Sequence, residues 1–147
     1  MIKNVVYVSQ AQAERWMPRE TDNFAIISIT GTHDPEANLD KNFKKVLKCK
    51  FDDIDEAILD DPKKNRKYYG INEIQAQEII ALTEELVKDE KFWLVIVHCH
   101  AGISRSAAVA KFISGKAGLY FLTSYNLYNK FVYSLLEKLD YYNSQNL

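Results

Sequence analysis

The chain has 147 residues, of which 47% are hydrophobic and 27% are charged, and its formal net charge is −1. This length and composition predict one compact domain over residues 1–147, with a core of its own and no room for a second domain. The balanced charge gives no global attraction to nucleic acid or to an acidic membrane, and no apolar run is long enough to span a bilayer. A signal-peptide pattern is absent and the two cysteines suit a reducing compartment, so we expect a cytoplasmic protein.

The first part of the chain alternates apolar runs with polar segments. Residues 5–8 predict a strand, residues 9–16 a short helix opened by a serine cap, and residues 24–30 an isoleucine-rich strand. After a loop, residues 46–51 alternate as a half-buried strand does. This strand leads directly into an acidic turn at residues 52–55, with the sequence Asp-Asp-Ile-Asp.

A segment rich in basic and aromatic side chains follows the acidic turn, at residues 63–69. If this basic-aromatic segment borders a binding pocket, its cations would attract an acidic substrate, and Tyr68 or Tyr69 would flank an aromatic ring or a base. The other interpretation is a solvated loop with its tyrosines packed on the core. His33, in the loop before the acidic turn, has the pattern of an ordinary loop residue.

The second part of the chain also alternates helices and strands. Asn72 with Gln75 three residues later is a capping pattern, and it precedes an apolar helical face. Residues 92–97 form a continuous apolar run typical of a buried strand. Residues 106–113 and 131–139 predict two further amphipathic helices. Strands that alternate with helices predict an α/β fold, with a central, mostly parallel sheet flanked by helices.

Residues 98–106, between the buried strand and the next helix, read His-Cys-His-Ala-Gly-Ile-Ser-Arg-Ser. We call residues 99–105 the Cys99 loop. A loop that enters a helix N-terminus can turn its backbone N–H groups inward and hold a tetrahedral oxyanion such as phosphate. Gly102 allows a left-handed backbone and close approach to a ligand, and Arg105 can grip two oxygens with its planar fork. The predicted phosphate-binding residues are His100, Ala101, Gly102, Ile103, Ser104 and Arg105.

Cys99 begins this loop, where the same N–H groups and the helix dipole would stabilise its thiolate. We expect a pKa well below the free value of about 8.5, which makes Cys99 a nucleophile at neutral pH. It would attack phosphorus to form a cysteinyl-phosphate while Arg105 holds the equatorial oxygens. Ser106 would donate a hydrogen bond to the departing sulfur, and His98 would point away from the pocket and fix the loop. The alternative is that Cys99 is an ordinary buried thiol.

These residues resemble the signature of the cysteine-based protein tyrosine phosphatase superfamily, His-Cys-x-x-Gly-x-x-Arg-Ser/Thr, and they are most similar to its dual-specificity branch. The resemblance implies a protein tyrosine phosphatase-like fold and catalysis through a phosphocysteine in a phosphate-binding P-loop. It implies no cofactor and no metal. The consecutive run His98-Cys99-His100 also lacks the ligand spacing of a zinc site.

Members of this superfamily need a general acid, usually an aspartate just after a strand. Phe51 is the last inward-facing apolar residue of the strand at residues 46–51. Counted from Phe51, the acid falls on Asp53, and Asp52 and Asp55 remain as alternatives. The acid would give a proton to the leaving group and then act as a base toward water.

The segment before the final helix departs from the dual-specificity pattern. Dual-specificity enzymes commonly have another helix before the final one, whereas residues 119–128 alone fill that gap here. Tyr128-Asn129 stands where relatives often carry Pro-Asn, so the final helix resumes in register.

Cys49, on the strand that leads to the acid, is either a plain core residue or a protective disulfide partner of Cys99 under oxidation.

We therefore predict a phosphatase of phosphate monoesters, with phosphotyrosine, and also phosphoserine or phosphothreonine, in a protein or peptide as its substrate. The positions between Cys99 and Arg105 carry no lysine, which disfavours a phosphoinositide substrate. An RNA 5′-phosphatase or triphosphatase is mildly supported by the basic-aromatic segment, although neither nucleic acid nor a membrane is an expected partner. A non-catalytic phosphate-binding module is the alternative from a different class. The physiological substrate and the oligomeric state stay open.

Overall fold

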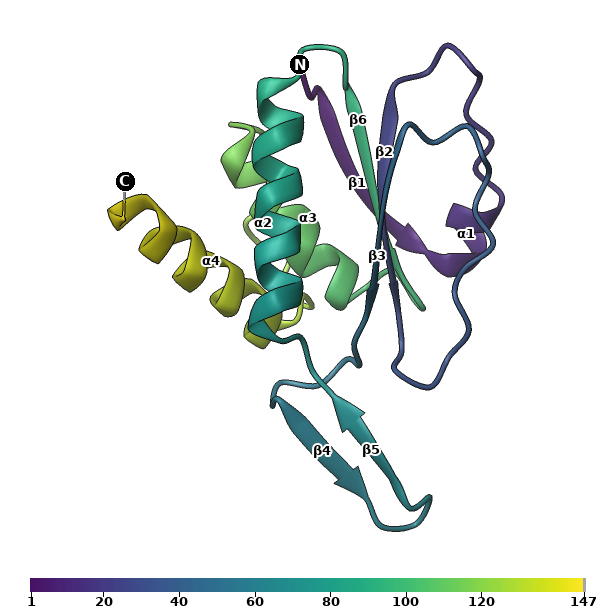
Figure 1. Cartoon of the computed structure of the whole chain (residues 1–147), viewed down its shortest axis with the longest axis vertical. Coiled ribbons are helices and arrows are strands. Elements are labelled where there is room, and N and C mark those ends of the chain that lie inside the picture. Colours follow the sequence, from purple (N-terminus) through teal and green to yellow (C-terminus); the bar gives the residue numbers. More distant parts are fainter. Residues whose placement is uncertain (147) are drawn as a thin grey trace.

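The structure, a computed structural model, describes residues 1–146 and has the α/β architecture predicted from the sequence (Figure 1). The elements in chain order are β1 (Asn4–Ser9), α1 (Gln10–Glu14), β2 (Phe24–Thr30), β3 (Lys45–Lys50), β4 (Ile58–Asp61), β5 (Arg66–Tyr69), α2 (Glu73–Lys88), β6 (Leu94–Cys99), α3 (Arg105–Lys116) and α4 (Lys130–Gln145). They form a single domain around one central sheet.

The central sheet has four strands in the order β1-β6-β2-β3, and every neighbouring pair is parallel. The inner strands β2 and β6 are buried along their whole length. The continuous apolar run at residues 92–97 predicted this for β6, and β2 is the predicted isoleucine-rich strand. Because the strands are parallel, their carboxyl ends meet at one edge of the sheet. The Cys99 loop leaves β6 at this edge, where open α/β sheets usually bind ligands.

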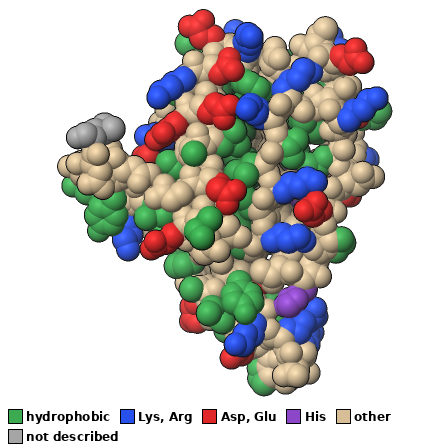
Figure 2. All heavy atoms as spheres, viewed as in Figure 1, with side chains coloured by type: hydrophobic (Ala, Val, Ile, Leu, Met, Phe, Trp, Pro, Cys, Tyr) green, Lys and Arg blue, Asp and Glu red, His purple; other side chains and the backbone are tan. Residues whose placement is uncertain are grey.

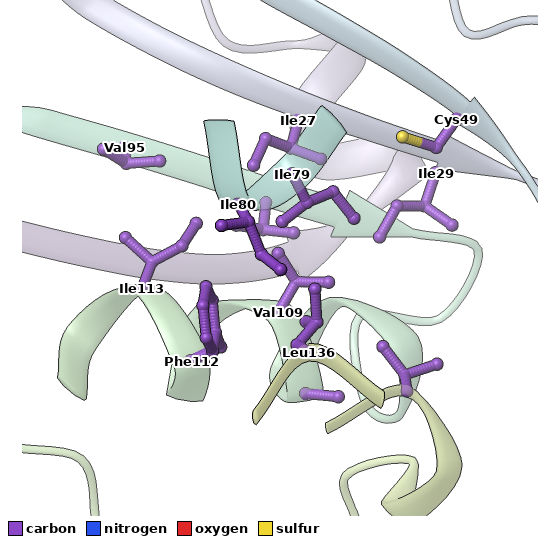
Figure 3. Packing of buried hydrophobic residues seen from close by; sticks show 14 of the residues in the cluster. Ile27, Ile29, Cys49, Ile79, Ile80, Val95, Val109, Phe112, Ile113 and Leu136 are labelled. Atoms are coloured by element: carbon purple, nitrogen blue, oxygen red, sulfur yellow. The ribbon is translucent and has the colours of Figure 1, made fainter. Parts of the chain in front are cut away.

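Helices cover the two faces of the sheet unequally. Helices α2, α3 and α4 lie on one face, and α1 with the long connection before β3 lies on the other (Figure 1). The larger hydrophobic core fills the space between the sheet and the three helices (Figure 3). Ile27 and Ile29 from β2 meet Ile79 and Ile80 from α2 there, with Phe112 from α3 close by. The small side chains of Ala107, Ala108 and Ala110 let α3 approach β6 closely. The N-terminus of α3 therefore lies at the Cys99 loop.

Helix boundaries follow the predicted caps. Ser9 and Asn72 each accept a hydrogen bond from a backbone N–H inside the helix and complete a capping box with Gln12 and Gln75. Helix α1 is shorter than predicted and ends at Glu14 rather than at residue 16. Among the helices of residues 1–146, none is both long and apolar enough to cross a membrane.

The basic-aromatic segment is not the solvated loop of one of the two interpretations, because its second half forms strand β5 of a hairpin. Strands β4 and β5 pair antiparallel as a hairpin, which projects from the main body at the carboxyl edge of the central sheet (Figure 1). Its turn contains Asn65 at φ 50°, a left-handed conformation that asparagine tolerates. Tyr68 is half-buried and Tyr69 is exposed, and neither belongs to the core clusters.

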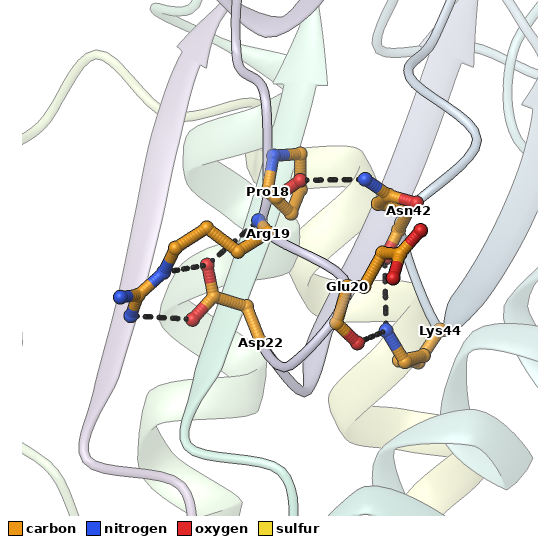
Figure 4. Close-up of polar contacts among 6 residues, drawn as sticks. All are labelled: Pro18, Arg19, Glu20, Asp22, Asn42 and Lys44. Atoms are coloured by element: carbon orange, nitrogen blue, oxygen red, sulfur yellow. Dashed lines mark hydrogen bonds and ion pairs between the residues drawn. The ribbon is translucent and has the colours of Figure 1, made fainter.

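Polar contacts at the opposite edge tie together the loops that lead into β2 and β3 (Figure 4). Asp22 accepts a hydrogen bond from Arg19 Nη2 at 3.0 Å, and Arg19 lowers the pKa of this carboxyl group. Asn42 Nδ2 donates to the carbonyl of Pro18 at 2.9 Å, and Lys44 Nζ donates to that of Glu20. These contacts belong to the scaffold, since the candidate site lies at the other end of the strands.

Candidate active site

The Cys99 loop is closed against the end of β1. Ser9 pairs with Cys99 in the parallel register, and Gln10 N–H donates to the carbonyl of His100 at 3.1 Å. Gly102 has φ 73°, and a Cβ atom there would lie 2.4 Å from both the Ser9 nitrogen and the Val8 carbonyl carbon. Such contacts exclude every other residue type, so the glycine predicted at this position is required by both its conformation and its surroundings.

The Cys99 thiol is buried within this loop, with 2% of the residue exposed. Its Sγ lies 3.1 Å from Ser106 Oγ, in the first turn of α3. Burial by itself raises the pKa of the thiol. The hydrogen bonds from the Ser106 side chain and backbone, the charge of Arg105 and the Gly102 backbone outweigh it, so the pKa is lowered overall. The direction agrees with the sequence prediction, and a thiolate in this position is a competent nucleophile.

Arg105 is the first residue of α3 and only 8% exposed. Its Nη1 donates to the carbonyl of Phe51 at 2.8 Å, so the end of β3 orients the guanidinium. Its Nε is buried and has no hydrogen-bond partner within residues 1–146. A buried donor without a partner is costly, and an anion held in the loop would satisfy it. Arg105 can therefore bind an oxyanion bidentately.

The three aspartates of the acidic turn have different surroundings. Asp53 Oδ1 accepts a hydrogen bond from Ser104 Oγ at 2.7 Å, which places this carboxylate at the Cys99 loop. Asp52 instead accepts from the backbone and hydroxyl of Thr32 and from Tyr69 N–H, at 2.6 to 3.0 Å. Asp55 lines a cleft of about 340 Å³ beside Ser104. The geometry thus favours Asp53 as the acid and leaves Asp52 a structural role.

Asn129 links the acidic turn, the Cys99 loop and α4. Its Nδ2 donates to Asp53 Oδ1 at 2.8 Å and to the Ile54 carbonyl at 3.2 Å. Its backbone N–H donates to the carbonyl of Ser104, and its Oδ1 caps α4 by accepting from Val132 N–H. Sequence reasoning noted the Tyr128-Asn129 pair without assigning it a role. The signal was an asparagine in the N-cap position before a helical apolar pattern.

The histidines lie around the loop in separate roles. His98 is buried on the face of β6 opposite Cys99, and its Nε2 lies 2.6 Å from Ser28 Oγ on β2. Burial lowers the pKa of His98, and the ring links β6 to β2 through Ser28, while its Nδ1 lies 3.2 Å from the Cys99 carbonyl. His100 is exposed and lines a cleft of about 240 Å³ with Asp34. His33, predicted as an ordinary loop residue, contacts the hairpin through a 2.7 Å hydrogen bond between its Nε2 and the Lys67 carbonyl.

Residues 119–128, which form no helix between α3 and α4, contribute an aromatic cluster. Tyr125 Oη donates to the carbonyl of Ile103 at 2.5 Å and so supports the Cys99 loop from outside. Burial, with Tyr7 and Cys99 nearby, raises the pKa of Tyr125 and keeps it a donor. The ring of Tyr7 on β1 lies 5.4 Å from that of Tyr125. The ammonium of Lys111 lies over the rings of Phe121, Tyr128 and Tyr133 at 5.1 to 5.2 Å.

Cys49 lies in the core and is separated from Cys99 by a strand. Cys49 on β3 pairs with Ile29 on β2, which in turn neighbours β6. Two inter-strand spacings put the Cα atoms about 9.6 Å apart, beyond the about 7 Å that a disulfide allows. Both thiols are free, and burial, with the charge of Glu78, raises the pKa of Cys49 to about 12. The register therefore favours the core role over the disulfide.

A larger cavity, of about 610 Å³, lies away from Cys99, between the base of the hairpin, the start of α2 and α4. Its lining is mostly apolar and includes Ile58, Ile71, Phe131 and Leu135. It contains no residue of the Cys99 loop. The two smaller clefts border that loop: one is lined by Asp53 and Ser104, and the other by His100.

Comparison with protein-family models, with curated proteins and with solved structures finds no match to this chain. Within the described residues, 1–146, no three His, Cys, Asp or Glu side chains gather in a way that could hold a metal ion.

Proposed function

We propose that the chain is a cysteine-dependent phosphatase of the protein tyrosine phosphatase type, which hydrolyses phosphotyrosine in a phosphorylated protein or peptide. One observation carries the proposal. The buried thiol of Cys99, whose pKa Ser106 and Arg105 lower, lies in the same loop as Arg105, and the buried Nε of Arg105 has no partner within residues 1–146 and points to an anionic guest. A plain core cysteine has no need of a neighbouring arginine or of a lowered pKa.

The first step transfers the phosphoryl group to sulfur. The Cys99 thiolate attacks phosphorus and forms the S–P bond while the ester P–O bond breaks. Arg105 and the inward N–H groups hold the equatorial oxygens as charge moves between them. Asp53 donates its proton to the leaving phenolate oxygen. Both of its hydrogen bonds reach Oδ1, which leaves Oδ2 to carry that proton.

The second step returns the enzyme to its starting state. Asp53, now a carboxylate, takes a proton from a water molecule, and the water oxygen attacks phosphorus. The S–P bond breaks, inorganic phosphate forms, and the sulfur leaves as a thiolate that accepts a hydrogen bond from Ser106, 3.1 Å away. Asn129 positions Asp53 for both steps through its 2.8 Å hydrogen bond.

Two features favour phosphotyrosine. Ile103 is 47% exposed in the Cys99 loop, beside Tyr125, and offers an apolar surface to a phenyl ring. The loop also has no lysine side chain that would recognise a second phosphate of an inositide. The substrate class therefore rests on the surroundings of the loop rather than on the nucleophile, which serves any phosphate monoester.

The test is hydrolysis of p-nitrophenyl phosphate and of a phosphotyrosine peptide in the presence of a chelator and a reductant. We expect Cys99→Ser to abolish turnover and Asp53→Ala to lower kcat about 10²-fold or more on the peptide. The loss on p-nitrophenyl phosphate should be smaller, because p-nitrophenolate leaves more readily than a phenolate whose conjugate acid has a pKa of about 10. Asp55→Ala, the matched variant, should lose much less than Asp53→Ala.

Three results would contradict the proposal. Turnover that survives Cys99→Ser would exclude the cysteine mechanism. Equal losses of kcat in Asp53→Ala and Asp55→Ala would show that Asp53 is not the general acid. A folded wild-type protein that binds vanadate but turns over neither substrate would instead be a phosphate-binding module.

A further inference from the structure

The hairpin β4–β5 is anchored directly beside the candidate acid. Asp52 N–H donates to the Tyr69 carbonyl at 2.6 Å, and Tyr69 N–H donates back to Asp52 Oδ2 at 2.8 Å. Asp53 is the next residue along the chain. The base of the hairpin and the carboxylate at the Cys99 loop are therefore held by consecutive residues of one turn.

A second contact connects the hairpin with the other side of the Cys99 loop. His33 Nε2 lies 2.7 Å from the Lys67 carbonyl, and its ring meets the Tyr68 ring edge-on at 5.8 Å. The residues after His33, Asp34 and Pro35, line a cleft with His100 of the Cys99 loop. The hairpin, the loop at residues 31–36 and the Cys99 loop thus form one continuous surface.

Charges are separated along this surface. Carboxylates lie close to the Cys99 loop, at Asp34, Asp53 and Asp55. The far end of the hairpin carries exposed cations that have no ion pair within 4 Å in the described part of the chain, namely Lys63, Lys64, Arg66 and Lys67. Figure 2 shows basic side chains beside a histidine at this end of the molecule. Two carboxylates on the same hairpin, at residues 60 and 61, leave it with a surplus of positive charge.

The geometry points to hairpin β4–β5 as a docking arm for an acidic segment of the phosphoprotein substrate, remote in sequence from the phosphotyrosine. This inference rests on the proposed phosphatase function. The turn at Asn65 is about 14 Å from Tyr69 at about 3.4 Å per strand residue, so an extended peptide that follows the hairpin from Tyr69 reaches the turn after about four residues. The cations are therefore remote in sequence from the phosphotyrosine, and positions about four to six residues from it are the first ones to test. Carboxylates immediately beside the phosphotyrosine would instead meet Asp34, Asp53 and Asp55 and be repelled.

The experiment compares phosphotyrosine peptides of equal composition. Three glutamates lie either next to the phosphotyrosine or about four to six residues away, on the N-terminal or the C-terminal side. For each protein variant we measure kcat/KM on an acidic peptide and on the same peptide with glutamine in place of each glutamate. The ratio of these two values cancels any difference in overall activity between variants. The hairpin variant is Lys63→Gln/Lys64→Gln/Lys67→Gln, and it keeps Arg66 because that side chain stacks on Tyr68. The control, Lys3→Gln/Lys88→Gln/Lys91→Gln, removes exposed lysines at the opposite edge of the sheet.

In the wild type we expect remote glutamates on one side to raise kcat/KM about five- to tenfold, from three exposed charge pairs, and adjacent glutamates to give no gain. The hairpin variant should lose this preference, the control should keep it, and about 0.5 M salt should remove it because the pairs are solvent-exposed. A wild-type ratio near one, or equal losses in both variants, would overturn the docking arm while p-nitrophenyl phosphate turnover still supports the phosphatase.

Two further outcomes separate the remaining possibilities. If the hairpin variant loses turnover of a 5′-triphosphorylated oligoribonucleotide more than turnover of the acidic peptide, the arm recognises RNA, and the inference of an acidic peptide is wrong. If the folded wild type turns over none of these substrates, the proposed function fails and the docking arm with it.

Discussion

The Cys99 loop and the hairpin β4–β5 leave the molecule at the same edge, but different contacts hold them. The two ends of the loop, Cys99 and Arg105, are buried, as is Ser106 after it, and the loop backbone at Gly102 is pressed against the end of β1. The hairpin is exposed and depends on a few side-chain contacts, chiefly those of Asp52 and His33. The loop therefore tolerates almost no change of shape, whereas the outer face of the hairpin is free to vary its charge. In the proposed enzyme, the Cys99 loop carries out the chemistry and the hairpin sets the preference for a substrate.

Among substitutions that leave Cys99, Arg105 and Asp53 in place, the largest effect should come from Gly102→Ala. The new methyl group would overlap the β1 backbone and force alanine to φ 73°, so we expect a loss of about 2 to 4 kcal/mol in unfolding free energy and at least about 10²-fold in kcat. Denaturant unfolding and phosphatase assays measure the two losses. Gly118→Ala separates the causes, because Gly118 has φ 70° but nothing within 4 Å of a Cβ. Equal effects of the two substitutions would mean that the contact with β1 is unimportant.

Asp52→Asn tests the anchor of the hairpin. An amide at this position would place its NH₂ group where one carboxylate oxygen now accepts, facing the backbone N–H of either Thr32 or Tyr69, which costs about 1 to 3 kcal/mol. We expect a lower unfolding free energy and faster hydrogen exchange in β4 and β5, with exchange in β6 changed least. Asp61→Asn, within the hairpin itself, is the matched control. Unchanged exchange in β4 and β5 would show that Asp52 is not the anchor.

Ser106→Ala should alter the pH dependence of the loop. The Ser106 hydrogen bond favours the thiolate and lowers the pKa of Cys99, so its removal raises that pKa. The acidic limb of kcat/KM and of iodoacetamide alkylation should therefore move to higher pH. Ser114→Ala, at another buried serine of α3, should leave the alkylation profile in place. A profile that stays unchanged in Ser106→Ala would show that the backbone N–H groups and Arg105 set the pKa without this hydroxyl.

The smallest expected effect is that of Tyr125→Phe. The substitution removes the hydrogen bond to the Ile103 carbonyl but keeps the ring against Tyr7, so about 1 kcal/mol of stability should be lost. We expect a severalfold fall in kcat, because the Cys99 loop would be less firmly held. Tyr120→Phe, at an exposed ring, is the control. Equal activities of the two variants would remove the support that we assign to residues 119–128.

Local patterns were sufficient to predict the regular elements of the main domain. An isoleucine-rich segment predicted β2, a continuous apolar run predicted the buried strand β6, and the capping residues Ser9 and Asn72 predicted two helix starts. The hairpin was missed because its strands have four residues each and lack an alternating apolar pattern, with Ile58 and Leu59 both exposed. A strand that buries neither face leaves no periodic signal in the sequence.

The sequence by itself determined which residues form the Cys99 loop and where it lies. Cys99, Gly102 and Arg105 are close in the chain, and a strand followed by a helix constrains the loop between them. Counting from Phe51 favoured Asp53 but left Asp52 and Asp55 open, and only the tertiary structure gave Asp52 and Asp53 different partners, because adjacent residues in a turn face different neighbours that come from distant segments. It likewise brought Tyr125 to the loop and aligned the hairpin beside it. Contacts between distant segments depend on how the sheet and helices pack. Because many residues of the core together determine this packing, no local sequence pattern predicts such contacts.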